Sequence, residues 1–355
     1  MRLPILICDD SNMARKQMAR SLPLGWDVEI TLATNGQEGL DAIKAGKGDI
    51  VFLDLNMPVM DGYEVLEAIQ KQDLPALVIV VSGDIQPQAY ERVKQLGALD
   101  FINKPTSKEK ITDILHKYGI VNPEQLAAIK NPPAQYIGND ELATLKSTVD
   151  DSNNVDITPY RDSYQEVANV AMGRAANLLA RMIGTFIHLP IPNVNMLETS
   201  ELHMALSSIE DNESMSAVCQ GFIGAGVSGE ALLLFRDSAF TNMAQLMGFK
   251  GELDDHGQLE VLMDVANILI GAYLKAISEQ LDMNLAQGQP VVLGQHLSIS
   301  ELITRNTSRW QRTLAIEINY QIESFDIKCD LLILITEDSL TTLNNKVGYL
   351  FDEEA

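Results

Sequence analysis

The chain has 355 residues, enough for two or three domains, and 46% of them are hydrophobic, which supports well-packed cores. Its net charge of -23 is uneven, because residues 1–120 carry 13 basic against 17 acidic side chains and the remainder carries most of the excess. The acidic second half argues against nucleic acid as a partner, since phosphate binding needs a basic face.

The three cysteines, Cys8, Cys219 and Cys329, are too few and too scattered for a disulfide framework, and no Cys/His cluster predicts zinc. The apolar run at the start is too short for a signal peptide, and no stretch approaches the length of a transmembrane span. We therefore expect a reduced, cytoplasmic protein without membrane insertion.

Apolar strand-like runs alternate with helical patterns through residues 1–120. Five βα units of this kind predict an α/β domain with a doubly wound, five-stranded parallel sheet. The expected strands are Pro4–Cys8, Asp27–Leu32, Ile50–Leu53, Ala76–Val81 and Phe101–Ile102. The expected helices are Ser11–Ser21, Gly36–Ala45, Gly62–Gln70, Pro87–Leu96 and Ser107–Tyr118.

Polar side chains stand where four of these strands end, and in a parallel sheet such positions meet at one rim. Three of them are the carboxylates Asp9, Asp10 and Asp54, which repel one another unless a cation lies among them, and oxygen ligands suit Mg²⁺. The other two, Ser82 and Lys104, are placed to hold oxygens of a phosphoryl group carried by Asp54. The pattern predicts a phosphoryl-accepting site centred on Asp54.

These residues, with Pro105 after Lys104, resemble the receiver domain of bacterial response regulators, and the resemblance covers residues 1–120. Five positions on four separate strands agree in order and spacing, so the match is highly specific. The resemblance implies that a histidine kinase phosphorylates Asp54.

The same resemblance assigns roles to further residues. It implies that Mg²⁺ is bound by Asp9, Asp10, Asp54 and the main-chain carbonyl of Asn56. It implies that Ser82 and Phe101 report phosphorylation by shifting position. It also implies that Asn56 and Asp84 tune the spontaneous loss of the phosphate.

Residues 121–154 are expected to form a linker with short helices, after which residues 155–355 show an internal repeat. Two long helices are predicted, Tyr160–Phe186 and Leu259–Leu281, and each carries polar residues at i, i+4 and i+7 on one face. Each triad is followed by a proline, and the two copies are separated by 98 residues: Asp162, Glu166, Asn169 and Pro192, then Glu260, Asp264, Asn267 and Pro290.

Paired strands follow each long helix, and each pair leads into an acidic-serine sequence suited to N-capping a helix. We therefore predict one α/β (α+β) domain built from two pseudo-twofold repeats, at about 158–250 and 256–350, and not a solenoid. The expected strands are Ser214–Phe222, Gly229–Phe235, Arg312–Ile322 and Ile327–Ile335, and the capping pairs are Asp237-Ser238 and Asp338-Ser339.

The repeated triad resembles the motif of the CheC/CheX/FliY family of chemotaxis phosphatases. The first copy fits fully, whereas the second has Glu260 for Asp or Ser and Asp264 for Glu. The resemblance implies an aspartyl-phosphate phosphatase in which Asn169 orients water and Glu166 pairs with the lysine of a substrate receiver. It implies the same roles for Asn267 and Asp264, although Asp264 reaches one methylene less.

Two functions remain open at this stage. In the first, the receiver regulates an enzyme that hydrolyses the aspartyl phosphate of a separate CheY-type response regulator, or of Asp54 itself. In the second, the C-terminal half is a decayed binding module and the protein is a phosphorylation-dependent adaptor or phosphate sink. Intact Glu166 and Asn169 favour the enzyme, and Asp264 favours the adaptor.

Overall fold

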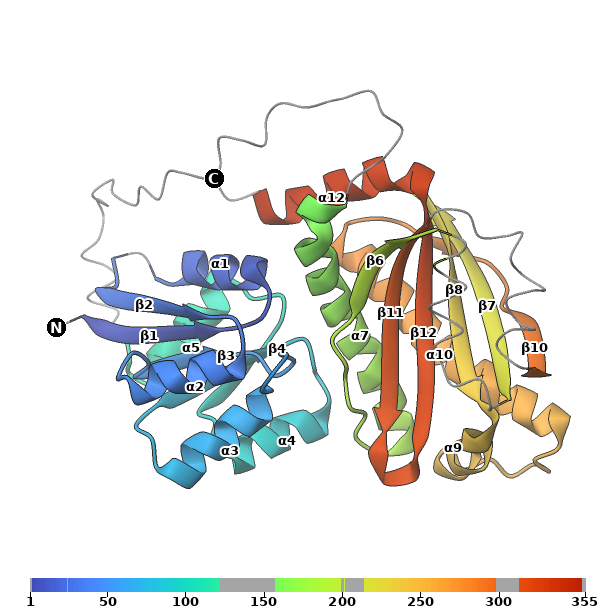
Figure 1. Cartoon of the computed structure of the whole chain (residues 1–355), viewed down its shortest axis with the longest axis horizontal. Helices are drawn as coiled ribbons and strands as arrows, with labels where there is room; N and C mark the ends of the chain where they lie inside the picture. The colour runs from blue at the N-terminus through green and yellow to red at the C-terminus, as the bar shows by residue number, and fades with distance from the viewer. Residues whose placement is uncertain are drawn as a thin grey trace.

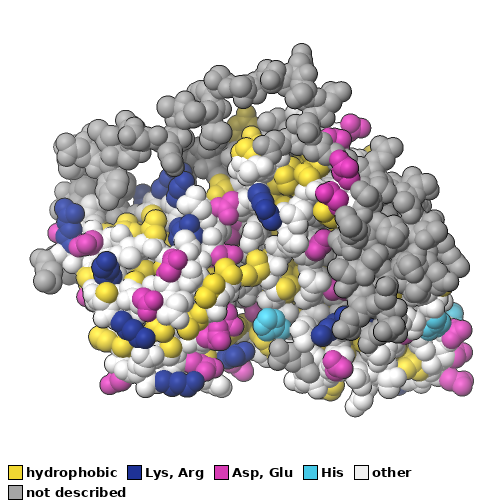
Figure 2. Space-filling view, in the orientation of Figure 1, with side chains coloured by type: hydrophobic (Ala, Val, Ile, Leu, Met, Phe, Trp, Pro, Cys, Tyr) yellow, Lys and Arg dark blue, Asp and Glu magenta, His cyan; other side chains and the backbone are white. Residues whose placement is uncertain are grey.

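The computed structural model describes residues 2–121 except Leu24, residues 157–198, Glu201, and residues 214–297 and 313–352. Figure 1 shows two domains side by side, with helix α7 (Arg161–Ile183) running along the seam between them. The predicted linker lies outside the described residues, apart from Val121. On the face in Figure 2 most basic side chains lie on the N-terminal domain, in keeping with the charge distribution of the sequence.

The N-terminal domain is a five-stranded parallel sheet with helices on both faces, as predicted. The strands are β1 (Leu3–Cys8), β2 (Val28–Ala33), β3 (Ile50–Leu53), β4 (Leu77–Ser82) and β5 (Asp100–Asn103). The helices are α1 (Asn12–Ser21), α2 (Gly36–Lys44), α3 (Gly62–Gln72), α4 (Pro87–Gln95) and α5 (Lys108–Lys117). The spatial order is β2-β1-β3-β4-β5, so β3 is central, and its full burial explains its continuous apolar run.

Two apolar layers hold this sheet. Helices α2, α3 and α4 pack on one face, and α1 and α5 pack on the other. Four of the five helices begin at a side chain that accepts a hydrogen bond from the first turn, which fixes where each starts. These capping residues are Ser11, Asn35, Asp61 and Ser107.

The C-terminal domain places α7 and a second long helix, α10 (Asp255–Gln280), on one face of an antiparallel sheet. The strands are β6 (Asn193–Leu197), β7 (Met215–Gly224), β8 (Val227–Arg236), β9 (Ala286–Gln287), β10 (Val291–Leu297), β11 (Thr313–Ile322) and β12 (Ile327–Thr336). The short helices are α9 (Phe240–Leu246) and α12 (Leu340–Asp352). The strand order is β10-β7-β8-β12-β11-β6, and β9 pairs with β7.

Each edge of this sheet is closed by a strand from the opposite half of the sequence. Strand β6, which follows α7, pairs with β11, and β10, which follows α10, pairs with β7. The sequence patterns did not predict β6, β9 or β10, because these strands are short or largely half-exposed and lack a clear apolar alternation. The two halves therefore interlock instead of packing as separate units.

The predicted helix caps in this domain are wrong. Asp237-Ser238 and Asp338-Ser339 each lie in a one-turn 3₁₀ helix without a side-chain cap. Asp237 instead accepts a hydrogen bond from Ser216 Oγ at 2.8 Å, and Ser339 Oγ accepts one from the backbone of Ser228 at 2.9 Å. These polar groups link strand ends to the turns that follow them.

Helix α10 is long and apolar enough to cross a membrane by length and composition, contrary to the expectation that no stretch approaches such a span. Of its 18-residue apolar window, 56% is buried inside the protein. The helix packs against α7 and the sheet, and it contributes a large share of the main hydrophobic core. Its apolar composition is therefore accounted for by its place in the core.

Candidate active site

Three carboxylates converge at the carboxyl ends of β1 and β3, where the parallel sheet was expected to bring them. One oxygen from each of Asp9, Asp10 and Asp54 lies within 4.8 Å of the others. Asp9 and Asp54 are buried, and Asp10 is half-buried. The chain can fold back over Asp54 because α3 begins with Gly62, where a Cβ would lie 2.3 Å from the Asp54 carbonyl oxygen.

Lys104 enters this acidic cluster from the loop after β5. Its Nζ lies 2.8 Å from Asp9 Oδ2 and 3.4 Å from Asp54 Oδ2, and the side chain is buried. Burial lowers its pKa, but the surrounding carboxylates of Asp54, Asp9 and Glu166 raise that pKa well above its ordinary value. The ammonium is therefore charged throughout the physiological pH range.

The oxygens left unsatisfied at this rim fit a divalent cation. Asp10 Oδ1 and Asp54 Oδ2 are buried and accept no hydrogen bond, the latter because Lys104 at 3.4 Å is not oriented to donate one. Burial and repulsion from Asp9 raise the pKa of Asp10 to about 6, and burial raises the pKa of Asp54 well above its ordinary value. Mg²⁺ would relieve this crowding, so Asp9, Asp10 and Asp54 suit it as ligands. Asn56 lies half-buried on the loop after β3.

The two predicted switch residues lie on neighbouring strands of the same sheet. Ser82 ends β4, is fully buried, and accepts a hydrogen bond at Oγ from the backbone of Asp84 at 3.2 Å. Phe101 on β5 is half-buried, and its ring meets Tyr90 edge-on with centroids 6.1 Å apart. Their movement on phosphorylation stays a prediction.

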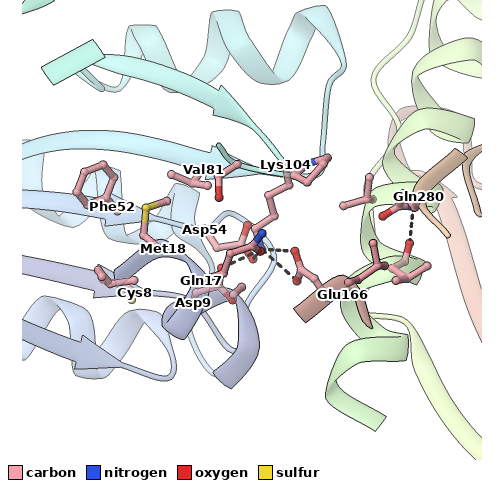
Figure 3. A pocket seen from close by; sticks show the side chains of 17 residues that line it. Cys8, Asp9, Gln17, Met18, Phe52, Asp54, Val81, Lys104, Glu166 and Gln280 are labelled. Atoms are coloured by element: carbon pink, nitrogen blue, oxygen red, sulfur yellow. Dashed lines mark hydrogen bonds and ion pairs between the residues drawn. The ribbon is translucent and has the colours of Figure 1, made fainter. Parts of the chain in front are cut away.

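Helix α7 lies across this rim and brings part of the predicted triad onto it (Figure 3). Glu166 Oε1 lies 3.3 Å from Lys104 Nζ, and the backbone N–H of Met13 donates to Asp162 Oδ2 at 3.3 Å. Burial raises the pKa of Glu166 to about 7. The first motif copy therefore faces the acidic cluster around Asp54 of its own chain.

Asn169, about one turn beyond Glu166 on α7, is 3% exposed and unpartnered. Neither Oδ1 nor Nδ2 of its side chain has a hydrogen-bond partner. Its backbone lies directly against the loop after β4, since a Cβ on Gly83 would be 3.1 Å from the Asn169 carbonyl oxygen. A buried amide without partners is unusual, and here it leaves both N–H donors and the carbonyl acceptor unused at the domain seam.

A cavity of about 100 Å³ opens between the domains at this point. Asp54, Lys104 and Glu166 line it, as Figure 3 shows, and Gln280 closes it from α10. Most of its lining is apolar, and its polar groups are gathered around Asp54, Lys104 and Glu166. The cavity therefore joins the carboxylate and the lysine of the N-terminal domain to a carboxylate of the other domain.

The second copy of the triad lies in a different environment. Glu260, Asp264 and Asn267 are all exposed on α10. The repeat thus conserves the spacing within the helix, but only the first copy is covered by a partner surface. The structure does not bring Asp264 and Asn267 together with the Asp54 site.

Several interdomain contacts were not predicted from sequence. Gln165 Nε2 donates to Asp10 Oδ2 at 3.3 Å, and Gln86 pairs with the backbone of Ile187. Lone glutamines carry no local signal, so these contacts become visible only in the fold. One further pair had a usable signal: Gly173 and Gly271 are also 98 residues apart, four positions after each motif asparagine.

The burial of Asp84, on the loop after β4, predicts that the stability of the protein depends on pH. It is 2% exposed, and its Oδ1 accepts a hydrogen bond from Gln86 N at 3.0 Å. Burial raises its pKa from 3.8 to about 6. The folded state therefore holds this proton more tightly than the unfolded state. The stability lost by ionising Asp84 is absent below pH 3.8, grows as the pH rises, and is complete above about 6.

Asp84→Asn keeps the acceptor oxygen and removes the charge. We expect it to raise the free energy of unfolding by up to about 3 kcal/mol at pH 8 and to change it little near pH 4. Urea denaturation of the full chain at both pH values measures the difference. Asp113→Asn, at an exposed position on α5, is the matched control. A gain of equal size at both pH values would show that burial of the charge is not the cause.

Known proteins resemble the N-terminal part of this chain. The family described as "Response regulator receiver domain" matches residues 5–116. The positive alginate biosynthesis regulatory protein of Pseudomonas aeruginosa is 34% identical over 134 residues, which cover 37% of this chain and 52% of that protein. Protein-glutamate methylesterase/protein-glutamine glutaminase 3 of Geobacter sulfurreducens is 37% identical over 106 residues, covering 30% and 28%. The chain spans about half of the first relative and less of the second.

Among solved structures, FliY from Thermotoga maritima covers 56% of this chain and 100% of its own, with 20% sequence identity and a TM-score of 0.43. The family match and the geometry agree for the N-terminal domain, where the acidic cluster, the buried lysine and the five-stranded parallel sheet coincide. Residues 5–116 are therefore a response regulator receiver domain, the module that accepts phosphate from histidine kinases in two-component signalling.

Proposed function

We propose that the C-terminal domain is an aspartyl-phosphate phosphatase, and that helix α7 acts on Asp54 of its own chain. The observation that supports this most directly is the seating of Glu166 on Lys104, 3.3 Å from its Nζ, with the unpartnered Asn169 one turn away. A histidine kinase would supply the phosphate to Asp54. The same residue is then both the input of the protein and a substrate.

The reaction needs little from the protein beyond placement of water. The Asn169 amide has an unused acceptor for a water hydrogen and an unused donor for an oxygen, so it can orient water toward phosphorus. The water oxygen bonds to phosphorus, the bond from phosphorus to the Asp54 carboxylate oxygen breaks, and inorganic phosphate leaves as H2PO4− with both hydrogens of the water. Lys104 stabilises the charge that develops on the phosphoryl oxygens and on the released carboxylate. Mg²⁺ held by Asp9, Asp10 and Asp54 would further neutralise those oxygens.

Glu166 positions helix α7 and takes no part in the making or breaking of bonds. Lys104 carries one positive charge among three carboxylates, and Glu166 is the member that comes from the other domain. A charge-assisted contact of this kind is short-ranged, so it holds α7 in one register on the rim. Because Asn169 lies on the same rigid helix, that register also fixes where its amide lies, next to the loop after β4.

Helix α10 is proposed to serve a separate CheY-type receiver. Asp264 and Asn267 are exposed there, and a Cβ on Gly271 would meet nothing closer than a side-chain oxygen at 4.0 Å. The corresponding Gly173 on α7 is covered by the receiver backbone. The surface that the chain's own receiver covers on α7 is therefore open on α10 to a separate receiver.

Glu166→Gln tests the proposal because it removes the charge and keeps the shape. The full chain is phosphorylated with acetyl phosphate and Mg²⁺, the donor is removed, and the decay of the Asp54 acyl phosphate is followed. We expect decay to slow by roughly tenfold or more, since a hydrogen bond to a charged group contributes about 1.5–3 kcal/mol. Glu252→Gln, exposed in the same domain, is the control. Unchanged decay would favour the adaptor instead.

A further inference from the structure

A single glutamine joins the receiver to the C-terminal domain through a reciprocal pair of hydrogen bonds. Gln86 Nε2 donates to the Ile187 carbonyl at 2.8 Å, and Ile187 N donates to Gln86 Oε1 at 2.9 Å. The amide thus satisfies both main-chain groups of one residue, as a neighbouring strand would. We propose that this Gln86–Ile187 clamp makes the α7 site select the receiver of its own chain over free receivers. The inference rests on the proposed phosphatase function.

Both sides of the clamp are held rigidly. On the receiver, Gln86 is 1% exposed, its backbone N donates to Asp84 Oδ1, and Pro87 begins α4 directly after it. On the other domain, Ile187 is fully buried, and the next residue, His188, pairs with Gln321 of β11 at 2.8 Å. Little freedom remains to be lost when the two sides meet, which favours a selective contact.

The clamp discriminates between receivers because a receiver without this glutamine leaves main-chain groups of Ile187 without hydrogen-bond partners. A receiver with an aliphatic side chain in place of Gln86 would bury the N–H and C=O of Ile187 without partners. Sites built to hydrogen-bond a partner reject analogues that lack those groups far more strongly than apolar pockets reject a missing methylene. We therefore expect docking at α7 to weaken by roughly 100-fold when the glutamine amide is absent.

Two neighbouring contacts are equally specific to this receiver surface. A Cβ on Gly173 of α7 would lie 2.0 Å from the Gly83 carbonyl oxygen, so glycine is required there for the helix to approach this loop. Phe186, just before the clamp, packs onto the receiver's hydrophobic core and shares a pocket with Leu55 and Tyr63. The loop 82–86 therefore carries the switch residue Ser82 at one end and the clamp at the other.

The test uses the full chain and its Gln86→Ala variant. Hydrogen exchange of the Met13 amide, which donates to Asp162 Oδ2 across the domain seam and away from the clamp, reports docking without relying on activity. Decay of the Asp54 acyl phosphate reports hydrolysis. Release of phosphate from a separate phosphorylated CheY-type receiver reports whether α7 has become accessible. We expect Met13 exchange to accelerate about 100-fold, Asp54 phosphate to persist longer, and release from the separate receiver to increase. Gln95→Ala, exposed on α4, is the matched control.

Gly173→Ala is a second variant that should undock the domains, because its Cβ would clash with the Gly83 carbonyl oxygen. Its change lies in the C-terminal domain, so it tests the inference even if Gln86→Ala misfolds the receiver. Alanine favours a helix more than glycine does, so α7 itself is not weakened. If Met13 exchange is unchanged in Gln86→Ala, the clamp is not the docking element and the inference is overturned. If exchange accelerates while Asp54 phosphate decays at the original rate, docking through Gln86 stands and the phosphatase proposal falls.

Discussion

Asn169→Ala is expected to slow the loss of phosphate from Asp54 by roughly 100-fold, because the attacking water loses the group that orients it. Both polar atoms of the Asn169 side chain lack partners, so removing the amide leaves no buried group newly unsatisfied. The stability of the protein should therefore change little, and a loss of activity cannot be attributed to unfolding. Decay of the acyl phosphate, measured on the full chain with Mg²⁺ after removal of the donor, gives the rate.

The matched control for this variant is Asn319→Ala, the same chemical change at an exposed position on β11. It should leave the decay of the Asp54 phosphate as it is in the wild type. Should Asn169→Ala also decay at the wild-type rate while its thermal unfolding is unaltered, water is not oriented by this amide. The hydrolysis of Asp54 phosphate would then be intrinsic to the receiver.

Asn267→Ala is expected to reduce phosphate release from a separate CheY-type receiver by about 100-fold, since α10 presents the exposed motif copy. Asp264→Glu should act in the opposite direction, because the added methylene restores the reach of the anchoring carboxylate. Release is followed with the phosphorylated receiver in excess over the full chain. Each asparagine variant serves as the control for the other: Asn267→Ala should leave Asp54 decay unchanged, and Asn169→Ala should leave release from the separate receiver unchanged.

A different pattern would reassign the sites. If Asn169→Ala abolishes release from the separate receiver and Asn267→Ala does not, α7 must leave its own receiver to act on others, and α10 has no catalytic part. If neither variant affects that release, the exposed copy on α10 is a binding surface at most. The adaptor interpretation would then apply to the second repeat.

The receiver site was predictable because each of its residues stands at the end of a strand that the local sequence pattern identifies. Asp54 follows a fully apolar run, and parallel strands necessarily bring such end residues to one rim. Lys104 and the carboxylates could be placed there without coordinates. The structure brings Lys104 within ion-pair distance of Asp9 and Asp54 and gathers the three carboxylates within 4.8 Å of one another. The spacing of Glu166 and Asn169 on one helix face was equally readable, because helical periodicity fixes it.

The sequence could not show which surface packs against the motif face of each long helix. Both motif copies have the same spacing, yet Asn169 is buried against a receiver and Asn267 is exposed. That difference depends on which helix the receiver packs against, which no local pattern encodes. Gln86 was missed for the same reason, since its role depends on a backbone 101 residues away. The failed capping prediction at Asp237 shows a tertiary hydrogen bond overriding a local propensity.

The exchanged edge strands of the C-terminal domain tie the two motif helices into a single cooperative unit. Because β6 completes the hairpin of the second half and β10 completes that of the first, neither half can retain a paired edge without the other. Cleavage of the backbone between α9 and α10 would still leave two mutually dependent fragments. Both motifs should therefore appear and disappear in one folding transition, so that a molecule with only one of them intact is not a stable product of truncation.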